Sequence, residues 1–82
     1  DIPPFIIANG QPLRFSGINS IGLRRRKFKP IQRSNIKKAY KIIYNSNHNT
    51  GQALEKIKND LSQKDEILTI VNFIDKSTRG II

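Results

Sequence analysis

Residues 30–44, with the sequence PIQRSNIKKAYKIIY, decide the fold class of this chain. Proline suits the first position of a helix, because its missing N–H would have no partner there. Apolar side chains follow at the three- and four-residue spacing that places them on one face of a helix. They are Ile36, Ala39, Tyr40, Ile43 and Tyr44. The pattern predicts an amphipathic helix, with the tyrosine rings at the edge of the core and their hydroxyls in water.

Two further amphipathic helices are predicted after this one. Asn49 and Gln52 have the spacing of a capping box, which marks the start of a helix. Ser62 and Asp65 predict the start of the last helix in the same way. The apolar residues of the two helices are Ala53, Leu54, Ile57 and Leu61, and then Ile67, Leu68, Ile70, Val71, Phe73 and Ile74. The second set is wide enough to predict burial on two sides, and three helices with short links form a small bundle.

Residues 1–18 are predicted to be extended chain with turns. Pro3 and Pro4 disfavour helical backbone in the residues before them, and the Asn9-Gly10 pair marks a turn. The apolar residues of the segment are Phe5, Ile6, Ile7, Leu13 and Phe15. A single strand leaves its backbone groups unpaired, so we expect this segment to dock on a part of the protein beyond these residues.

The chain has 82 residues, a net charge of +9 and no cysteine. Its length fits one small domain, and the lack of cysteine excludes disulfide frameworks and thiolate chemistry. Its longest apolar run has four residues, which is too short to cross a bilayer. Ten of the fifteen lysines and arginines, but only one of the six acids, lie in residues 1–41. This asymmetry predicts an anionic partner, such as nucleic acid, a phosphorylated metabolite, an acidic protein or a membrane surface, unless it is simply a solvated basic face.

The most informative stretch for function is residues 17–28, GINSIGLRRRKF. Its two glycines permit close backbone approach, an asparagine amide lies beside them, and four cations follow. Guanidinium groups bind phosphate oxygens through paired charge-assisted hydrogen bonds, so the stretch predicts a phosphate or phosphodiester site. The single histidine, His48, falls in a link between helices with no acid or nucleophile nearby in sequence, so no catalytic role is predicted for it.

Four motifs follow one another along the chain: DIPPFIIANG, GINSIGLRRRKF, AYKIIYNS and STRGII. In this order and spacing they resemble the C-terminal region of the UDP-N-acetylglucosamine acyltransferase family, over essentially the whole chain. Members of that family have a left-handed parallel β-helix followed by a helical C-terminal domain, and they assemble as homotrimers. The resemblance implies that residues 1–16 are the last coil of such a β-helix with its linker, and that residues 17–82 are the helical domain.

The resemblance also implies an activity, the first step of lipid A biosynthesis. Family members transfer a 3-hydroxyacyl chain from acyl carrier protein to the 3-hydroxyl of UDP-N-acetylglucosamine, in the cytoplasm and without a metal ion or cofactor. Their general-base histidine lies in the β-helix. This chain would therefore be inactive alone, and it would serve substrate binding and trimer assembly.

Substrate-binding residues are implied by the same resemblance. Asn19, Arg25 and Arg26 match the family's contacts to the nucleotide sugar, with the arginines on the pyrophosphate. Ile21 stands where the family has a glutamate, which removes one polar contact. Pro12 stands near the end of the acyl channel, where some relatives have histidine, so the preferred acyl length is not implied.

Acyl carrier protein is strongly acidic, so charge complementarity predicts a docking surface for it. The residues expected there are Lys29, Arg33, Lys37, Lys38 and Lys41. Two alternatives stay open, a non-enzymatic basic helical module that binds nucleic acid and a trimer clamp without ligand contacts. The first is disfavoured because the cations cluster in one short turn, without a helix-turn-helix or RNA-binding signature.

Overall fold

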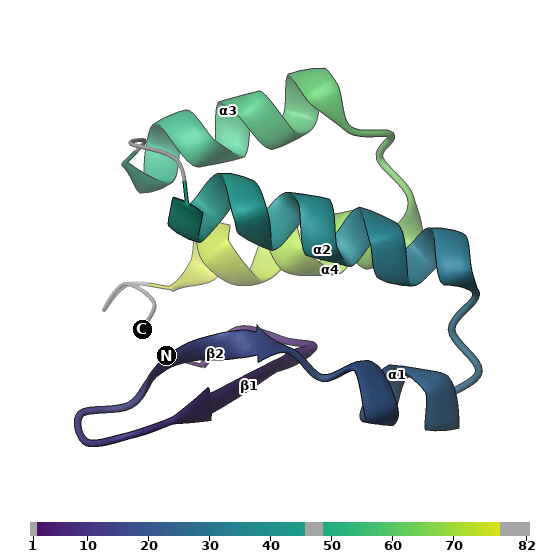
Figure 1. The fold of residues 1–82 in the computed structure, drawn as a ribbon. Coiled ribbons are helices and arrows are strands. Elements are labelled where there is room, and N and C mark those ends of the chain that lie inside the picture. The colour runs from purple at the N-terminus through teal and green to yellow at the C-terminus, as the bar shows by residue number, and fades with distance from the viewer. Residues whose placement is uncertain (1, 46–48, 78–82) are drawn as a thin grey trace.

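The computed structural model describes residues 2–45 and 49–77, which form two short strands followed by four helices (Figure 1). The strands are β1 (Ile6–Asn9) and β2 (Arg14–Ile18). The helices are α1 (Ser20–Arg25), α2 (Pro30–Asn45), α3 (Thr50–Asp60) and α4 (Asp65–Lys76). Figure 1 shows α2 between α3 and the β1–β2 hairpin, and α4 packs against α2. The predicted mainly helical class is confirmed.

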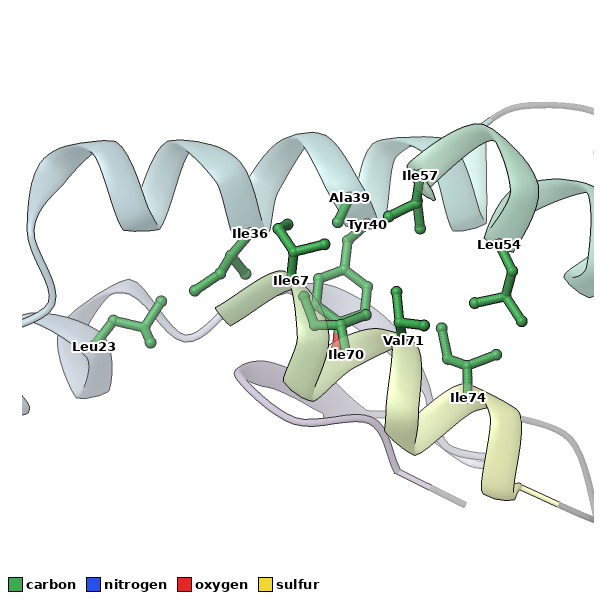
Figure 2. Packing of buried hydrophobic residues seen from close by; sticks show 10 residues of the cluster. All are labelled: Leu23, Ile36, Ala39, Tyr40, Leu54, Ile57, Ile67, Ile70, Val71 and Ile74. Carbon is green, nitrogen blue, oxygen red and sulfur yellow. The ribbon is translucent and has the colours of Figure 1, made fainter. Parts of the chain in front are cut away.

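One hydrophobic core joins the four helices (Figure 2). Its buried residues are Leu23 from α1; Ile36, Ala39 and Tyr40 from α2; Leu54 and Ile57 from α3; and Ile67, Ile70, Val71 and Ile74 from α4. The short helix α1 is held to this core by Leu23, which is 2% exposed. Burying one leucine is worth about 2 kcal/mol, so this side chain fixes the helix that carries the cationic turn.

The predicted starts of α2 and α3 are confirmed. Helix α2 begins at Pro30. Helix α3 follows Asn49, whose Oδ1 accepts the N–H of Gln52 at 2.8 Å. Gln52 Oε1 accepts the N–H of Asn49 in return at 3.0 Å, which completes the capping box. Two otherwise unpaired backbone donors are thereby satisfied, so the local sequence is enough to set this helix start.

The predicted start of α4 at a Ser62–Asp65 capping box is wrong. Helix α4 begins at Asp65, and the residue before it, Lys64, makes no side-chain cap bond. The preceding link is instead a turn tied to the end of α3. Lys64 N–H donates to the carbonyl of Ser62 at 2.9 Å, and Gln63 Nε2 donates to the carbonyl of Leu61 at 3.0 Å. These bonds occupy the link, so helical backbone resumes only at Asp65.

Helix α4 is buried on one side rather than on the two sides predicted. Leu68 is 40% exposed and Phe73 only packs against the rim of the core. The buried face includes one carboxylate, Glu66, which is 4% exposed. Its Oε1 lies 3.5 Å from the side-chain amide of Asn35, and this contact joins α4 to α2.

The N-terminal segment is not the single strand assumed from the sequence, because its two strands pair with each other; its docking on another part of the protein stays a prediction. Strands β1 and β2 pair in antiparallel fashion, with Ile6 opposite Ile18 and Asn9 opposite Arg14. The predicted turn follows β1, where Gly10 has a φ of +91° that an L side chain rarely adopts. The pairing satisfies backbone groups that a single strand would leave open.

The hairpin packs on α2 through aromatic rings. Phe15 of β2 stacks on Tyr40 and Tyr44, with ring centroids 5.8 Å and 4.3 Å away. The predicted water-exposed tyrosine hydroxyls are wrong. Tyr40 OH donates to the carbonyl of Pro4 at 2.6 Å, and within the described residues the buried Tyr44 hydroxyl has no hydrogen-bond partner. The rings therefore tie the hairpin to the helices.

Candidate functional site

The three predicted substrate residues lie at the two ends of α1. Asn19 caps its N-terminal end, and Arg25 and Arg26 lie at its C-terminal end. All three are exposed. With a rise of 1.5 Å per residue, the two ends are roughly 10 Å apart along the axis. An elongated anionic ligand is of a length that suits contacts at both ends.

Asn19 is held in place by hydrogen bonds of its side chain and of its backbone. Its side-chain Oδ1 accepts the N–H of Gly22 at 3.0 Å, which caps the helix. Its backbone N–H donates to the carbonyl of Phe5 at 2.7 Å. The cap uses one lone pair of Oδ1, so the Nδ2 group and the second lone pair of Oδ1 remain available to a ligand.

Gly22 is required by the conformation of Asn19. A Cβ atom on Gly22 would lie 2.7 Å from Asn19 Nδ2 and 2.9 Å from its Cγ, which is too close for any real side chain. The sequence predicted that this glycine would permit close backbone approach. The close neighbour is the asparagine side chain itself, so Gly22 positions the amide.

The C-terminal end of α1 turns sharply in a Schellman motif. Lys27 N–H donates to the carbonyl of Arg24 and Phe28 N–H donates to the carbonyl of Leu23, both at 3.0 Å. Lys27 itself has a φ of +61°, the left-handed conformation that such a turn needs. The turn brings Phe28 back beside the arginine at the end of the helix.

Arg26 lies against two aromatic rings. The guanidinium carbon is 5.2 Å from the ring centre of Phe28 and 5.9 Å from that of Phe5. These are cation–π distances. Within residues 2–45 and 49–77, no carboxylate pairs with Arg25 or Arg26. Both positive charges are thus available to a ligand. The sequence pattern does not mark Phe5 and Phe28 as site residues, although Phe28 directly follows the run of cations.

Four of the five cations expected to dock an acidic partner lie on α2. They are Arg33, Lys37, Lys38 and Lys41, which we call the basic stripe. Three of them recur every four residues, the spacing of neighbours on one helix face. Lys29 precedes the helix, and its N–H donates to the side chain of Gln32 at 2.7 Å. Arg33 Nη1 donates to the carbonyl of Phe28 at 2.9 Å, which connects the stripe to the end of the α1 turn.

A groove of about 350 Å³ runs beside the basic stripe. Its lining residues are Phe15, Gly17, Ile18, Lys37, Tyr40 and Lys41. The aromatic and aliphatic side chains come from β2 and α2, and the two lysines are exposed. The groove therefore combines an apolar wall with positive charge.

His48 lies outside the described residues, so the structure does not test the prediction that it has no catalytic role. In the ranges that the structure describes, no three histidine, aspartate or glutamate side chains gather in a group that could hold a metal ion. Over the same ranges no helix has the length and hydropathy needed to cross a bilayer.

The fold and the α1 geometry define the class of protein: a small helical domain with an ordered turn at the end of α1 that carries several cations. Comparison with known families then identifies the family. This chain belongs to the family described as UDP N-acetylglucosamine O-acyltransferase, domain 2, whose model matches residues 1–82.

Individual relatives agree with this assignment. The chain is 40% identical to an acyl-[acyl-carrier-protein]–UDP-N-acetylglucosamine O-acyltransferase of Thermodesulfovibrio yellowstonii, over 99% of this chain and 31% of that protein. It is 42% identical to the enzyme of the same name from Chlorobium phaeobacteroides, over 98% of this chain and 31% of the relative. The chain thus spans about a third of the length of the curated relatives it matches.

A solved structure supports the fold as well. The UDP-N-acetylglucosamine acyltransferase of Bacteroides fragilis superposes with a TM-score of 0.96 and 52% identity. The superposition covers 100% of this chain and 32% of that structure. Neither the family match nor these relatives support the nucleic-acid alternative.

Proposed function

We propose that this chain is the C-terminal substrate-binding and assembly domain of an enzyme of lipid A biosynthesis. The enzyme transfers a 3-hydroxyacyl chain from acyl carrier protein to the 3-hydroxyl of UDP-N-acetylglucosamine. Support comes from the family match over residues 1–82 and from the names of the curated relatives. The proposed activity belongs to the whole cytoplasmic enzyme, whose general base lies outside this chain, so the chain alone is inactive.

The proposed enzyme is a homotrimer built on a left-handed parallel β-helix. We assign residues 1–16 to the last coil of that β-helix and its linker, and residues 17–82 to the helical domain. Within this chain β2 (Arg14–Ile18) crosses that boundary and pairs with β1 in antiparallel fashion, so the hairpin itself differs from a parallel coil. Support comes from the hairpin surface, where Ile7 is 46% exposed and Leu13 is 48% exposed. Exposed aliphatic side chains of this kind suit a surface that a neighbouring part of the assembly covers.

The observation that carries the proposal is the arrangement of Asn19, Arg25 and Arg26 at the two ends of α1. The arginines hold the pyrophosphate of the nucleotide sugar through charge-assisted hydrogen bonds. Asn19 holds the adjoining nucleotide through its Nδ2 group. Ile21, which is 68% exposed, offers no hydrogen bond where the family has a glutamate. Accurate placement matters, because misplacing a reacting group by about 1 Å can cost roughly 100-fold in rate.

The test is Arg26→Ala in the full-length enzyme. Losing a charge-assisted hydrogen bond costs about 1.5–3 kcal/mol, so we expect the KM for UDP-N-acetylglucosamine to rise about 10- to 100-fold. Arg24→Ala is the matched control, since Arg24 is also exposed on α1 but lies outside the predicted contacts. An unchanged KM in Arg26→Ala, with unchanged circular dichroism, would favour the alternative of a trimer clamp without ligand contacts.

The second part of the proposal concerns the acyl donor. We propose that Lys29 and the basic stripe dock acyl carrier protein through complementary charge. Support comes from the row of cations along α2 and from the groove beside it. A surface of this length suits an acidic protein better than a small anion, because one or two cations already satisfy a small anion.

Charge reversal tests this docking surface. In the full-length enzyme, Lys37→Glu with Lys41→Glu is expected to raise the KM for the acylated carrier about ten-fold at low ionic strength, and less in high salt. Lys58→Glu on the exposed face of α3 is the control, with no expected change. An acyl-pantetheine donor, which lacks the acidic protein, should be used equally well by all variants. If the reversed pair keeps a normal KM for the carrier, the carrier docks elsewhere.

A further inference from the structure

Phe5 precedes β1 and lies far from α1 in sequence, yet it contacts both ends of the α1 site. Its carbonyl accepts the N–H of Asn19 at 2.7 Å. Its ring centre is 5.9 Å from the guanidinium carbon of Arg26. The same ring meets Phe28 edge to face, with centroids 5.4 Å apart and an angle of 62° between the planes. One residue therefore connects the two ends of α1, whose backbones are roughly 10 Å apart along the helix axis.

The backbone of Phe5 is held in an unusual conformation. Its φ is +69°, a region that a bulky L residue rarely adopts. Such a conformation persists only where the surroundings over-determine it. Two hydrogen bonds do so here. Tyr40 OH donates to the carbonyl of Pro4 at 2.6 Å, and Asn19 N–H donates to the carbonyl of Phe5 itself. The backbone of Phe5 is therefore held by the core and by α1 together, and its ring meets Phe28 from this fixed position.

The rings of Phe5 and Phe28 restrict the exposed Arg26 side chain. An arginine guanidinium that contacts aromatic rings still has N–H donors for phosphate oxygens. An unsupported arginine at the same position would populate many rotamers, and ligand binding would have to immobilise it. The aromatic contacts reduce that loss of conformational freedom before the ligand arrives.

We propose that Phe5, together with Phe28, is a positioning residue for the nucleotide sugar. This inference rests on the proposed function, because it assumes that Arg26 binds the pyrophosphate. Phe5 touches no substrate. It acts by holding the Arg26 guanidinium and the Asn19 backbone in one fixed relation, so that an elongated nucleoside diphosphate meets both without rearrangement.

The test compares three variants of the full-length enzyme. Phe5→Leu keeps an apolar side chain but loses the aromatic face, and the KM for UDP-N-acetylglucosamine is expected to rise about two- to five-fold, the range of an exposed cation–π contact. The kcat and the KM for the acylated carrier should not change. Phe5→Tyr keeps the ring and should retain the wild-type KM. Phe73→Leu, at another half-buried phenylalanine, is the matched control and should leave the KM unchanged.

A double variant separates this proposal from the proposed function. In an Arg26→Ala background, Phe5→Leu should add nothing to the KM, because the side chain it positions is gone. If Arg26→Ala raises the KM but Phe5→Leu does not, the positioning role is overturned and the proposed function stands. If Arg26→Ala has no effect either, both fall. Should Phe5→Leu fail to fold, Phe28→Leu replaces it with the same expected KM and the same overturning result.

Discussion

The position of the Asn19 side chain depends on the lack of a side chain at Gly22. In Gly22→Ala the new methyl would lie 2.7 Å from Asn19 Nδ2, so the asparagine must leave its capping position. Alanine gains about 1 kcal/mol of helix propensity, whereas the lost cap costs about 1 kcal/mol. We expect little net change in the free energy of unfolding, measured by denaturant titration, together with a raised KM for the nucleotide sugar.

Gly51 provides the matched control for this substitution. It also lies in the first turn of a helix behind a capping asparagine, but its added Cβ would lie 3.5 Å from Asn49 Oδ1, an ordinary contact. Gly51→Ala should therefore keep its cap and raise the free energy of unfolding by up to about 1 kcal/mol. Equal stabilisation by both alanines, with a normal KM in Gly22→Ala, would show that Asn19 does not depend on the glycine.

At this scale the sequence predicted the residues whose roles are local. Asn19 belongs to the stretch that predicts the phosphate site, and its capping bond to α1 joins residues only three apart in sequence. Phe5 could not be recognised, since its link to Arg26 exists only after the hairpin folds back against α1. The resemblance to a known family supplied Asn19, Arg25 and Arg26 as binding residues, and their role in binding remains a proposal.

At the scale of elements, α1 ends at an unfavourable residue. The Schellman motif places Lys27 at a φ of +61°, where glycine is normally found because it has no Cβ to clash. Lys27→Gly should relieve that strain and raise the free energy of unfolding by about 1 kcal/mol. Lys38→Gly, in the interior of α2, is the control and should lower the free energy by about 1 kcal/mol. Destabilisation by Lys27→Gly in a thermal melt would contradict the assigned turn.

Helix starts were predictable only where the capping bonds are local. The Asn49–Gln52 box and Pro30 both act within one turn, and both start helices where the sequence placed them. Ser62 has the same local signature but starts no helix. Instead, the side-chain amide of Gln63 donates to the carbonyls of Ile57 and Leu61 at the end of α3, and these bonds compete with a helix start at Ser62. The pairing of β1 with β2 was likewise not predictable, because the residue pattern within one strand does not indicate which strand it pairs with.

At the scale of the whole molecule, Tyr40 links three parts of the fold. It is a residue of α2, it is 1% exposed within the hydrophobic core, and its ring stacks on Phe15 of the hairpin. Its hydroxyl holds the carbonyl of Pro4, the residue directly before Phe5. Figure 2 shows the ring between Ile67, Ile70 and the helix that carries it. The stability of the core and the geometry of the α1 site therefore depend on the same side chain.

This arrangement predicts how stability changes at alkaline pH. Burial, and next the neighbouring Tyr44, raise the pKa of Tyr40 well above the ordinary tyrosine value of 10.0. Burial raises the pKa of Tyr44 in the same direction. Below about pH 10 both the folded and the unfolded chain keep these protons, so the tyrosines add no pH dependence. Above that pH the unfolded chain loses protons that the folded chain retains. The free energy of unfolding should then fall by up to about 1.4 kcal/mol per pH unit for Tyr40.

Two phenylalanine substitutions distinguish the hydroxyls. Tyr40→Phe should abolish most of the alkaline slope, and it should cost about 1 kcal/mol at pH 7 because the Pro4 carbonyl loses its donor. Tyr44→Phe should be neutral or slightly stabilising at pH 7, since its buried hydroxyl has no partner within the described residues. Denaturant titrations between pH 8 and pH 11 measure the free energy of unfolding of each variant relative to the wild type. Lysines also titrate in this range, but they are the same in all three proteins, so their contribution cancels in the comparison. An alkaline slope that persists unchanged in Tyr40→Phe would mean that the hydroxyl is not buried in the folded chain, and the link from the core to Phe5 would be lost with it.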